Sequence, residues 1–370
     1  MSNTAENCIP GGMPLTEFFR DYWQKKPLLV RGALPDIPVI DANELAGYAL
    51  EKNVESRLII EQPNPIAPLL SGWKLIHGPL TAKRFKSLPE SHWTLLIQAV
   101  NQLHPDIDEL LRRFRFIPNW RIDDVMVSYA ADQGGVGPHF DYYDVFLLQA
   151  SGKRRWRIGQ TCSSQSRLRK DTDCKILQDF TSQDEWIVEP GDLLYIPPGV
   201  AHWGIAEGEC MTYSVGFRAP SHSEILLDYC QEVASTLNED QRFADPDRTP
   251  GIHPGLISDA DLDQVRKLLQ QLLLDEKNLG SWFGRYMTLA RREAPRFDAE
   301  PVHPLLAPGV RAAYRQHDGH SARLYIDGEE FSCSLSLAEA LCAGDDPTEL
   351  DLSPADQTLL HQLSAQGLLV

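Results

Sequence analysis

The sequence lacks the features that mark several common classes of protein. Its seven cysteines lie between Cys8 and Cys342 and form no C-x-x-C pair, which argues against a disulfide framework or a zinc ribbon. No apolar stretch approaches the roughly 20 residues that a membrane-spanning helix needs. The first 12 residues have neither the charged nor the apolar region of a secretory signal. We therefore expect a cytoplasmic protein with reduced thiols that does not bind membranes.

Basic residues are also scarce. The chain has 35 Lys and Arg residues against 52 Asp and Glu residues, which gives a formal net charge of −17. Such a surface repels phosphate backbones, so direct binding of nucleic acid is not expected. It would attract a basic protein, although many cytosolic enzymes are simply acidic. No repeat with a period of roughly 20 to 50 residues is visible, which excludes solenoids and propellers.

The chain does contain ample material for a large core. Hydrophobic residues make up 42% of the sequence and include 13 Phe, 11 Tyr and 8 Trp. Between Arg121 and Phe217, short apolar or alternating runs are separated by Gly and Pro, with no helical pattern between them. This spacing is typical of an antiparallel barrel or jelly roll rather than of a parallel α/β sheet. At 370 residues the chain is also too long for one average domain.

The pattern changes after Pro220. Ser221-x-x-Glu224 and Ser258-x-x-Asp261 are typical of capping boxes, and apolar residues at helical spacing follow each of them. A third helix is predicted over residues 279–293. The stripe after the second box is strongly helical and consists of Leu262, Val265, Leu268, Leu269, Leu272 and Leu273.

A small α+β region closes the chain. Asp327-Gly328 between two short apolar runs indicates a hairpin, and Ser353-Pro354 indicates the start of a final helix. Residues 295–308 are rich in proline and indicate a linker. We therefore expect three parts: a mainly β domain with N-terminal additions at 1–220, a helical segment at 221–300 and a small C-terminal domain at 301–370.

The residues that carry chemistry lie in two segments. The segment 134–141, GGVGPHFD, ends with His139 and Asp141, which would share one face of a strand. About 60 residues later, a Pro-Gly-Asp turn, a short strand and a Pro-Pro-Gly turn lead to His202. Two His and one carboxylate with open coordination positions make the facial triad of non-haem Fe(II) oxygenases. A zinc hydrolase or a metal-free barrel is the alternative.

Together these segments resemble the JmjC-type 2-oxoglutarate oxygenases, and within them the bacterial ribosomal oxygenases that hydroxylate an arginine of a large-subunit ribosomal protein. The resemblance extends through YWQKKP at 22–27, WRIDD at 120–124 and YSVGFRAP at 213–220, and through the helical and C-terminal layout. It implies a double-stranded β-helix of the cupin type. It also implies a helical segment that forms a homodimer and a winged-helix-like C-terminal domain.

The same resemblance implies an enzyme that binds Fe(II) through His139, Asp141 and His202 and uses 2-oxoglutarate and O₂ as co-substrates. The reaction would hydroxylate the arginine side chain at its β-carbon. Related JmjC enzymes hydroxylate His or Lys, or demethylate proteins, so these activities remain alternatives. A catalytically silent barrel that acts in binding or assembly is a further alternative, although the presence of all three ligands speaks against it.

The distal carboxylate of 2-oxoglutarate requires a cation. Arg154 lies 15 residues after His139, where this class of oxygenase has its basic co-substrate residue. Strand alternation would turn Arg154 inward and its neighbours Lys153 and Arg155 outward. An inward arginine can bind a carboxylate bidentately. The alternative is that all three form a solvated run of charge.

Substrate binding is predicted on the strand near residue 124. Asp124, Met126 and Ser128 share one face by the period of two, and an inward Asp124 could pair with a guanidinium. The alternative for Asp124 is a strand-end cap or a surface acid, since Asp123 adjoins it and only one of the two can face inward. The resemblance implies that the substrate arginine is surrounded by Asp124, Met126, Tyr143 and Ser214, with the Tyr143 ring along its aliphatic stem.

Overall fold

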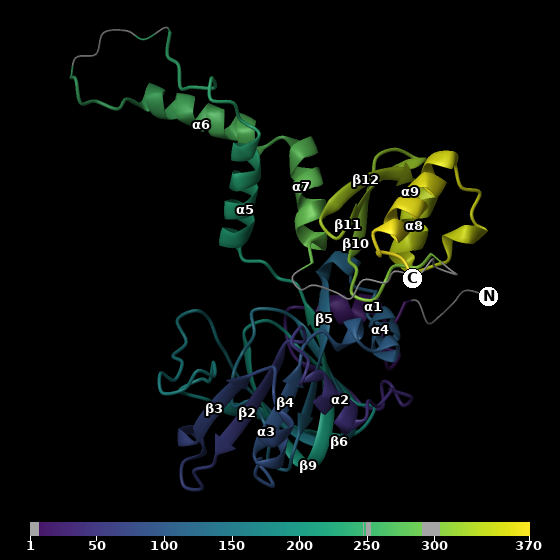
Figure 1. Ribbon diagram of the computed structural model, residues 1–370. Helices are drawn as coiled ribbons and strands as arrows, with labels where there is room; N and C mark the ends of the chain where they lie inside the picture. The colour runs from purple at the N-terminus through teal and green to yellow at the C-terminus, as the bar shows by residue number, and fades with distance from the viewer. Residues whose placement is uncertain (1–6, 247, 249–252, 291–303) are drawn as a thin grey trace. The chain divides into compact units, whose positions relative to one another are not determined.

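The computed structural model describes residues 7–246, 248, 253–290 and 304–370, which form two compact units (Figure 1). The first unit runs to Ala219 and includes Ala307–Gly309, and the second begins at Pro220. The central helices and the C-terminal elements belong to the same second unit. The predicted boundary at residue 300 lies outside the described residues, so the division into three parts stays a prediction.

The first unit consists of a large sheet and short helices. Its helices are α1 (Leu15–Asp21), α2 (Ala42–Tyr48), α3 (Ala82–Lys86) and α4 (Pro105–Arg112). Its strands are β1 (Leu28–Val30), β2 (Ser56–Gln62), β3 (Gly72–His77), β4 (Trp93–Ile97), β5 (Ile122–Ala130), β6 (Val145–Thr161), β7 (Ser182–Val188), β8 (Leu193–Ile196) and β9 (Val200–Phe217).

The nine strands form one sheet in the order β1-β8-β6-β9-β5-β4-β2-β3, with β7 paired to β6. Their pairings are antiparallel. The long strands β6 and β9 are central, because β6 pairs with β7, β8 and β9, while β9 also pairs with β5. This antiparallel arrangement confirms the predicted mainly β core and excludes a parallel α/β sheet for the first unit.

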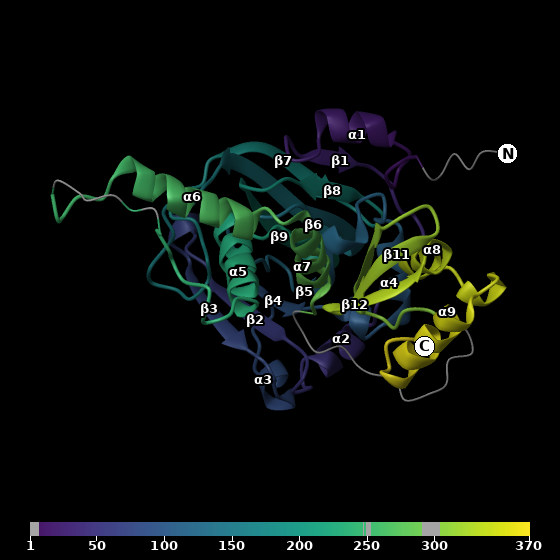
Figure 2. The same ribbon diagram turned by 90° about the horizontal axis from the view of Figure 1, so that it is seen from above.

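Both faces of the central strands are buried, so side chains alternate between two apolar clusters. Phe146 and Tyr195 belong to one cluster, and Leu147 and Leu194, their neighbours on the same strands, belong to the other. Phe18 of α1 completes the first cluster, with its ring centroid 5.8 Å from that of Phe146 and 5.2 Å from that of Tyr195. Figure 2 shows α1 beside β1 and β8. The N-terminal additions therefore cover one face of the sheet.

A buried carboxylate joins these additions to the sheet. Asp144 is fully buried, and it accepts hydrogen bonds from the Tyr195 hydroxyl at 2.6 Å and from the Gln24 amide at 2.9 Å. Nη2 of Arg121 lies 3.4 Å from the same carboxylate. Burial raises the pKa of Asp144, and the bonds from Tyr195 and Gln24 oppose that shift. Two segments that carry the family resemblance, 22–27 and 120–124, thus meet at one acid.

The second unit contains α5 (His222–Ser235), α6 (Asp259–Leu273), α7 (Glu276–Thr288), β10 (Ala312–Gln316), β11 (Ser321–Ile326), β12 (Glu329–Ser334), α8 (Leu335–Ala343) and α9 (Pro354–Ala365). Both predicted capping boxes are present, with Ser221 capping α5 and Ser258 capping α6. The third helix, predicted over 279–293, begins earlier, and its predicted last residues lie outside the described residues. None of the described helices has the length and apolarity needed to cross a bilayer.

The C-terminal part of this unit is a three-stranded antiparallel sheet with two helices. The predicted hairpin joins β11 and β12, and both Asp327 and Gly328 have positive φ, at 52° and 88°. Such angles suit the tight turn that Asp-Gly favours. Ser353 caps α9 and Pro354 is its first residue, as predicted. The winged-helix-like assignment stays a prediction.

Helix α6 leaves much of its leucine stripe uncovered. The exposed fractions of Leu262, Leu268 and Leu269 are 51%, 43% and 50%. At the end of the helix, Leu272 and Leu273 instead pack against the cluster that contains Trp282. Apolar side chains on a helix normally face a core, so this exposed leucine stripe is a candidate contact surface.

Candidate metal centre

The three predicted metal ligands come from two parts of the first unit. His139 and Asp141 lie between β5 and β6, and His202 is the third residue of β9. The prediction that His139 and Asp141 lie on a strand is wrong, because this segment forms only isolated bridges, at Gly135 and His139. Its backbone turns at Gly137, whose φ of +78° is incompatible with a strand.

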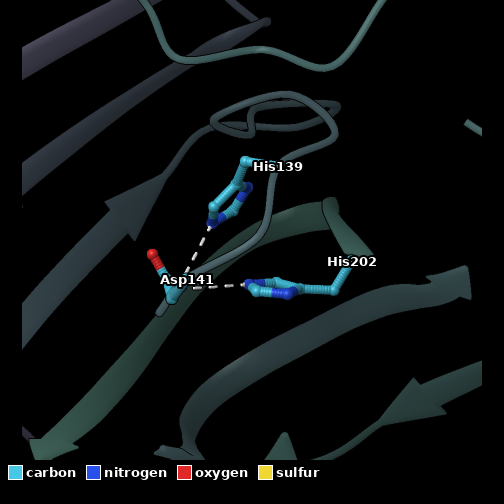
Figure 3. A group of neighbouring side chains, drawn as sticks. All are labelled: His139, Asp141 and His202. Atoms are coloured by element: carbon cyan, nitrogen blue, oxygen red, sulfur yellow. Dashed lines mark ion pairs between the residues drawn. The ribbon is translucent and has the colours of Figure 1, made fainter. Parts of the chain in front are cut away.

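Reciprocal backbone hydrogen bonds hold the two histidines opposite each other. The His139 N–H donates to the His202 carbonyl at 3.0 Å, and the His202 N–H donates to the His139 carbonyl at 2.8 Å. Oδ2 of Asp141 lies 4.0 Å from Nε2 of His139 and 3.7 Å from Nε2 of His202 (Figure 3). The three ligand atoms all lie within 4.8 Å of one another, so they can converge on one ion.

The second nitrogen of each imidazole is fixed by the main chain. Nδ1 of His139 lies 2.9 Å from the carbonyl oxygen of Gly137, and Nδ1 of His202 lies 2.9 Å from that of Val200. A carbonyl oxygen only accepts, so each Nδ1 carries the proton and donates it. Each Nε2 therefore presents a lone pair toward Asp141, which is the tautomer that a metal ligand requires.

Burial keeps His202 neutral. Only 2% of its surface is exposed, and this burial, together with the neighbouring His139, lowers the pKa of His202 to about 4. The nearby carboxylate of Asp141 opposes that shift, but desolvation is the larger effect. At neutral pH the imidazole is thus unprotonated at Nε2 and able to bind a metal.

Arg154 is the buried cation of the site, as predicted from strand alternation. It is 4% exposed, and its Nη1 lies 3.4 Å from both the Ser128 hydroxyl and the Thr212 hydroxyl. Its Nε and Nη2 are buried and have no hydrogen-bond partner among the described residues. A buried guanidinium with two unused donors is costly unless an anion pairs with it. The arrangement therefore fits a ligand with a carboxylate.

The indole ring of Trp156 lies near both Arg154 and the predicted metal ligand His202. Its ring centroid lies 5.6 Å from the Arg154 guanidinium carbon and 5.8 Å from the His202 ring centroid. A Cβ at Gly204 would lie 2.7 Å from the indole, so only glycine leaves room for the ring at that position. The indole N–H is buried and, within the described chain, lacks an acceptor. Sequence reasoning missed this residue, although its place two residues after Arg154 on the same strand was a signal.

The neighbours of Arg154 face outward, which confirms the predicted alternation. Lys153 pairs with Glu189 at 2.5 Å. Arg155 pairs with Glu185 and Glu207. The alternative, a solvated run of charge, therefore describes Lys153 and Arg155 but not Arg154.

The predicted substrate residues lie on β5 and around it. Asp124 is 4% exposed, so it is not a surface acid. Met126 lies directly opposite Ser214 of β9 in the strand register. Ser128, two residues further along β5, contacts Arg154. The predicted substrate residues Asp124 and Met126 therefore lie on the same strand as a residue that contacts Arg154.

Tyr143 lies near Asp141, a predicted metal ligand, and near Asp124, a predicted substrate residue. Desolvation raises the pKa of its phenol, and the carboxylates of Asp141 and Asp124 raise it further. The side chain keeps 41% of its surface exposed, so it lies at the rim rather than in the interior.

Two residues next to Asp124 were not predicted. Nε2 of Gln98 donates to Oδ1 and to Oδ2 of Asp124, at 3.0 Å each. Nη2 of Arg57 donates to Oε1 of Gln98 at 2.8 Å. Neither residue belongs to a sequence motif. Only the pairing of β2, β4 and β5 brings them together, so the sequence offered no signal for them.

Known proteins are similar to this chain in both sequence and fold. The JmjC domain family matches residues 109–225, a range that contains all eight candidate residues. The ribosomal protein uL16 3-hydroxylase of Escherichia coli is 37% identical over 293 residues, which cover 79% of this chain and 75% of that protein.

Solved structures agree over nearly the whole chain. The X-ray structure of E. coli YcfD is 31% identical, has a TM-score of 0.85 and covers 97% of this chain and 98% of its own. YcfD, a ribosomal oxygenase, in complex with cobalt and 2-oxoglutarate has a TM-score of 0.80, with 31% identity over 96% of this chain and 97% of its own. This chain thus belongs to the JmjC-domain oxygenases, in the family of the ribosomal oxygenases.

Proposed function

We propose that this protein is an Fe(II)- and 2-oxoglutarate-dependent hydroxylase that acts on an arginine side chain of a large-subunit ribosomal protein. The observation that carries the proposal is that two features occur together in the first unit. A convergent His139–Asp141–His202 set offers three metal ligands. A buried Arg154 offers an anion two donors that have no partner in the described part of the chain. A zinc hydrolase would have no use for the second feature.

The residues present fit both the metal and the co-substrate. Two neutral imidazole nitrogens and one carboxylate would hold Fe(II) and leave positions open for other ligands. Arg154 would bind the distal carboxylate of 2-oxoglutarate through Nε and Nη2, while Ser128 and Thr212 hold Nη1. When bound, the iron would supply oxidative chemistry that converts 2-oxoglutarate and O₂ to succinate and CO₂ and hydroxylates the substrate.

The choice of arginine rests on the acid that faces the site. A buried carboxylate such as Asp124 can hold a guanidinium through charge-assisted hydrogen bonds. Met126 and Ser214 would line the remaining wall, and Tyr143 would cover the aliphatic stem from the rim. The name of the E. coli relative, a uL16 3-hydroxylase, supports a ribosomal protein substrate and reaction at the β-carbon. We accordingly expect the reaction to take place in the cytoplasm.

The overall charge favours a basic protein partner. The net charge of −17 would attract a cationic ribosomal protein and repel bare nucleic acid. Hydroxylation of His or Lys remains the principal alternative, because an acid also binds an ammonium or a protonated imidazole. Demethylation would use the same ligands and Arg154, so it also remains an alternative. A silent binding role is less well supported, since the ligands and Arg154 are all present.

We further propose a homodimer formed through α6. The half-exposed Leu262, Leu268 and Leu269 give this helix an apolar surface that a second copy would bury.

The first prediction concerns the metal ligands. His139→Ala and His202→Ala should each lose Fe(II) binding and reduce 2-oxoglutarate decarboxylation to background, because the site needs its three protein ligands. Succinate formation measures activity, and titration with Co²⁺ followed by absorption measures binding. His77→Ala, at an exposed histidine of β3, is the matched control. Full decarboxylation by either ligand variant would exclude this triad.

The second prediction concerns Arg154. Arg154→Ala leaves the distal carboxylate without its bidentate partner, so the apparent KM for 2-oxoglutarate should rise about tenfold or more. Arg155→Ala, next to it on the outer face, should leave that KM unchanged. A rise of less than about twofold in the Arg154 variant would mean that another residue holds the carboxylate.

The third prediction tests the substrate. Asp124→Asn keeps the size of the side chain but removes its charge, so hydroxylation of an arginine peptide should fall about tenfold or more. Asp123→Asn is the control and should do little. Mass spectrometry of peptides with a central Arg, His or Lys provides the readout. Oxygen incorporation into His or Lys but not into Arg would disprove the arginine assignment and leave the oxygenase assignment intact.

The fourth prediction tests the dimer. Wild-type protein should sediment at twice the chain mass, and Leu262→Arg combined with Leu269→Arg should sediment as a monomer. Leu272 is left unchanged because it packs within the unit. Leu70→Arg, at a residue that is 67% exposed in the first unit, is the control. A monomeric wild type at micromolar concentration would contradict the interface.

A further inference from the structure

The carboxylate of Asp124 is held by an amide whose other end is held by a cation. Nε2 of Gln98 lies 3.0 Å from each oxygen of Asp124, and Oε1 of Gln98 accepts a hydrogen bond from Arg57 at 2.8 Å. The charges on the two sides dictate the orientation of the amide. Its N–H₂ can only donate and must face the carboxylate, and its carbonyl can only accept and must face the guanidinium.

The backbone around Gln98 fixes this geometry. The Gln98 N–H donates to the Glu55 carbonyl at 3.0 Å, and the next residue, Ala99, is buried with a left-handed φ of 55°. The side chain of the buried Asn101 accepts a hydrogen bond from the Val125 N–H at 3.0 Å, where the register of β5 shifts. The segment after β4 therefore holds β5 at two points, which are the side chain of Asp124 and the backbone N–H of Val125.

Arg57 reaches two of the predicted substrate residues. The same Nη2 that donates to Gln98 lies 3.3 Å from Sδ of Met126. Arg57 thus contacts Met126 directly and Asp124 only through the neutral amide. If the amide were absent, nothing in this chain of hydrogen bonds would separate a guanidinium of the protein itself from the acid that is proposed to bind the substrate.

We infer that Gln98 is a positioning residue for the substrate guanidinium. Its two hydrogen bonds fix the plane of the Asp124 carboxylate, and its neutral amide keeps Arg57 from forming a direct ion pair with that carboxylate. The inference rests on the proposed function, since it assigns Gln98 a part in recognising the same arginine side chain.

The test compares two variants with a matched control. Gln98→Leu keeps a similar volume but has neither donor nor acceptor, and Gln98→Glu sets a second carboxylate against Asp124. In both, the KM for an arginine peptide should rise about tenfold, the loss expected for a charge-assisted hydrogen bond, while kcat changes much less. The same Gln→Leu change at the exposed Gln183 of β7 should leave the KM for the peptide unchanged.

A double-mutant cycle separates positioning from general support of the fold. If Gln98 acts through Asp124, adding Gln98→Leu to Asp124→Asn should raise the KM for the peptide little further. Fully additive losses would overturn the inference, as would an equal rise in the KM for 2-oxoglutarate, which would indicate a structural role.

Failure of the inference can be told from failure of the proposed function. Unchanged kinetics in Gln98→Leu beside a severe loss in Asp124→Asn would overturn the inference and leave arginine recognition standing. Unchanged peptide kinetics in Asp124→Asn would overturn arginine recognition, and the role of Gln98 with it.

Discussion

The candidate metal centre depends on the main-chain pairing of His139 with His202. This pair belongs to a longer contact in which the segment after β5 is bound along the start of β9. Gln133 donates to Ala206 at 3.0 Å, Ala206 donates to Gly134 at 2.9 Å, and Gly199 donates to the Asp141 carbonyl at 2.7 Å. Main-chain hydrogen bonds thereby hold an irregular segment beside β9 and bring two ligand-bearing parts of the chain together.

The glycines of this segment follow from that close contact. A Cβ at Gly135 would lie 2.5 Å from the Gly204 carbonyl oxygen, and a Cβ at Gly134 would collide with the Trp93 carbonyl. Glycine is therefore required because backbone passes directly over backbone. The segment is not a regular strand, because its backbone turns at Gly137, where φ is positive.

Sequence patterns predicted the features that depend on local geometry. The capping boxes at Ser221 and Ser258, the Asp327-Gly328 turn and the inward direction of Arg154 follow from spacing within a few residues, and the structure has them. The grouping of His139, Asp141 and His202 was predicted because both segments carry unusual turn residues. Gln98 and Arg57 could not be predicted, since their positions depend on how β2, β4 and β5 pair. The exposed face of α6 was visible as a leucine stripe, but the sequence alone could not show how much of it the same chain would cover.

The two imidazoles of the candidate metal centre are oriented by the carbonyl groups of Gly137 and Val200 rather than by side chains. A carboxylate or hydroxyl in that position could be lost through a single codon change, whereas every residue type provides a carbonyl. The orientation of the ligands is therefore protected from most point mutations outside the ligands themselves. Substitution of the Val200 side chain should therefore leave the orientation of the His202 imidazole unchanged. Position 137 is constrained for a different reason, since its positive φ and the packing of Ile176 and Trp73 against it leave no room for a side chain.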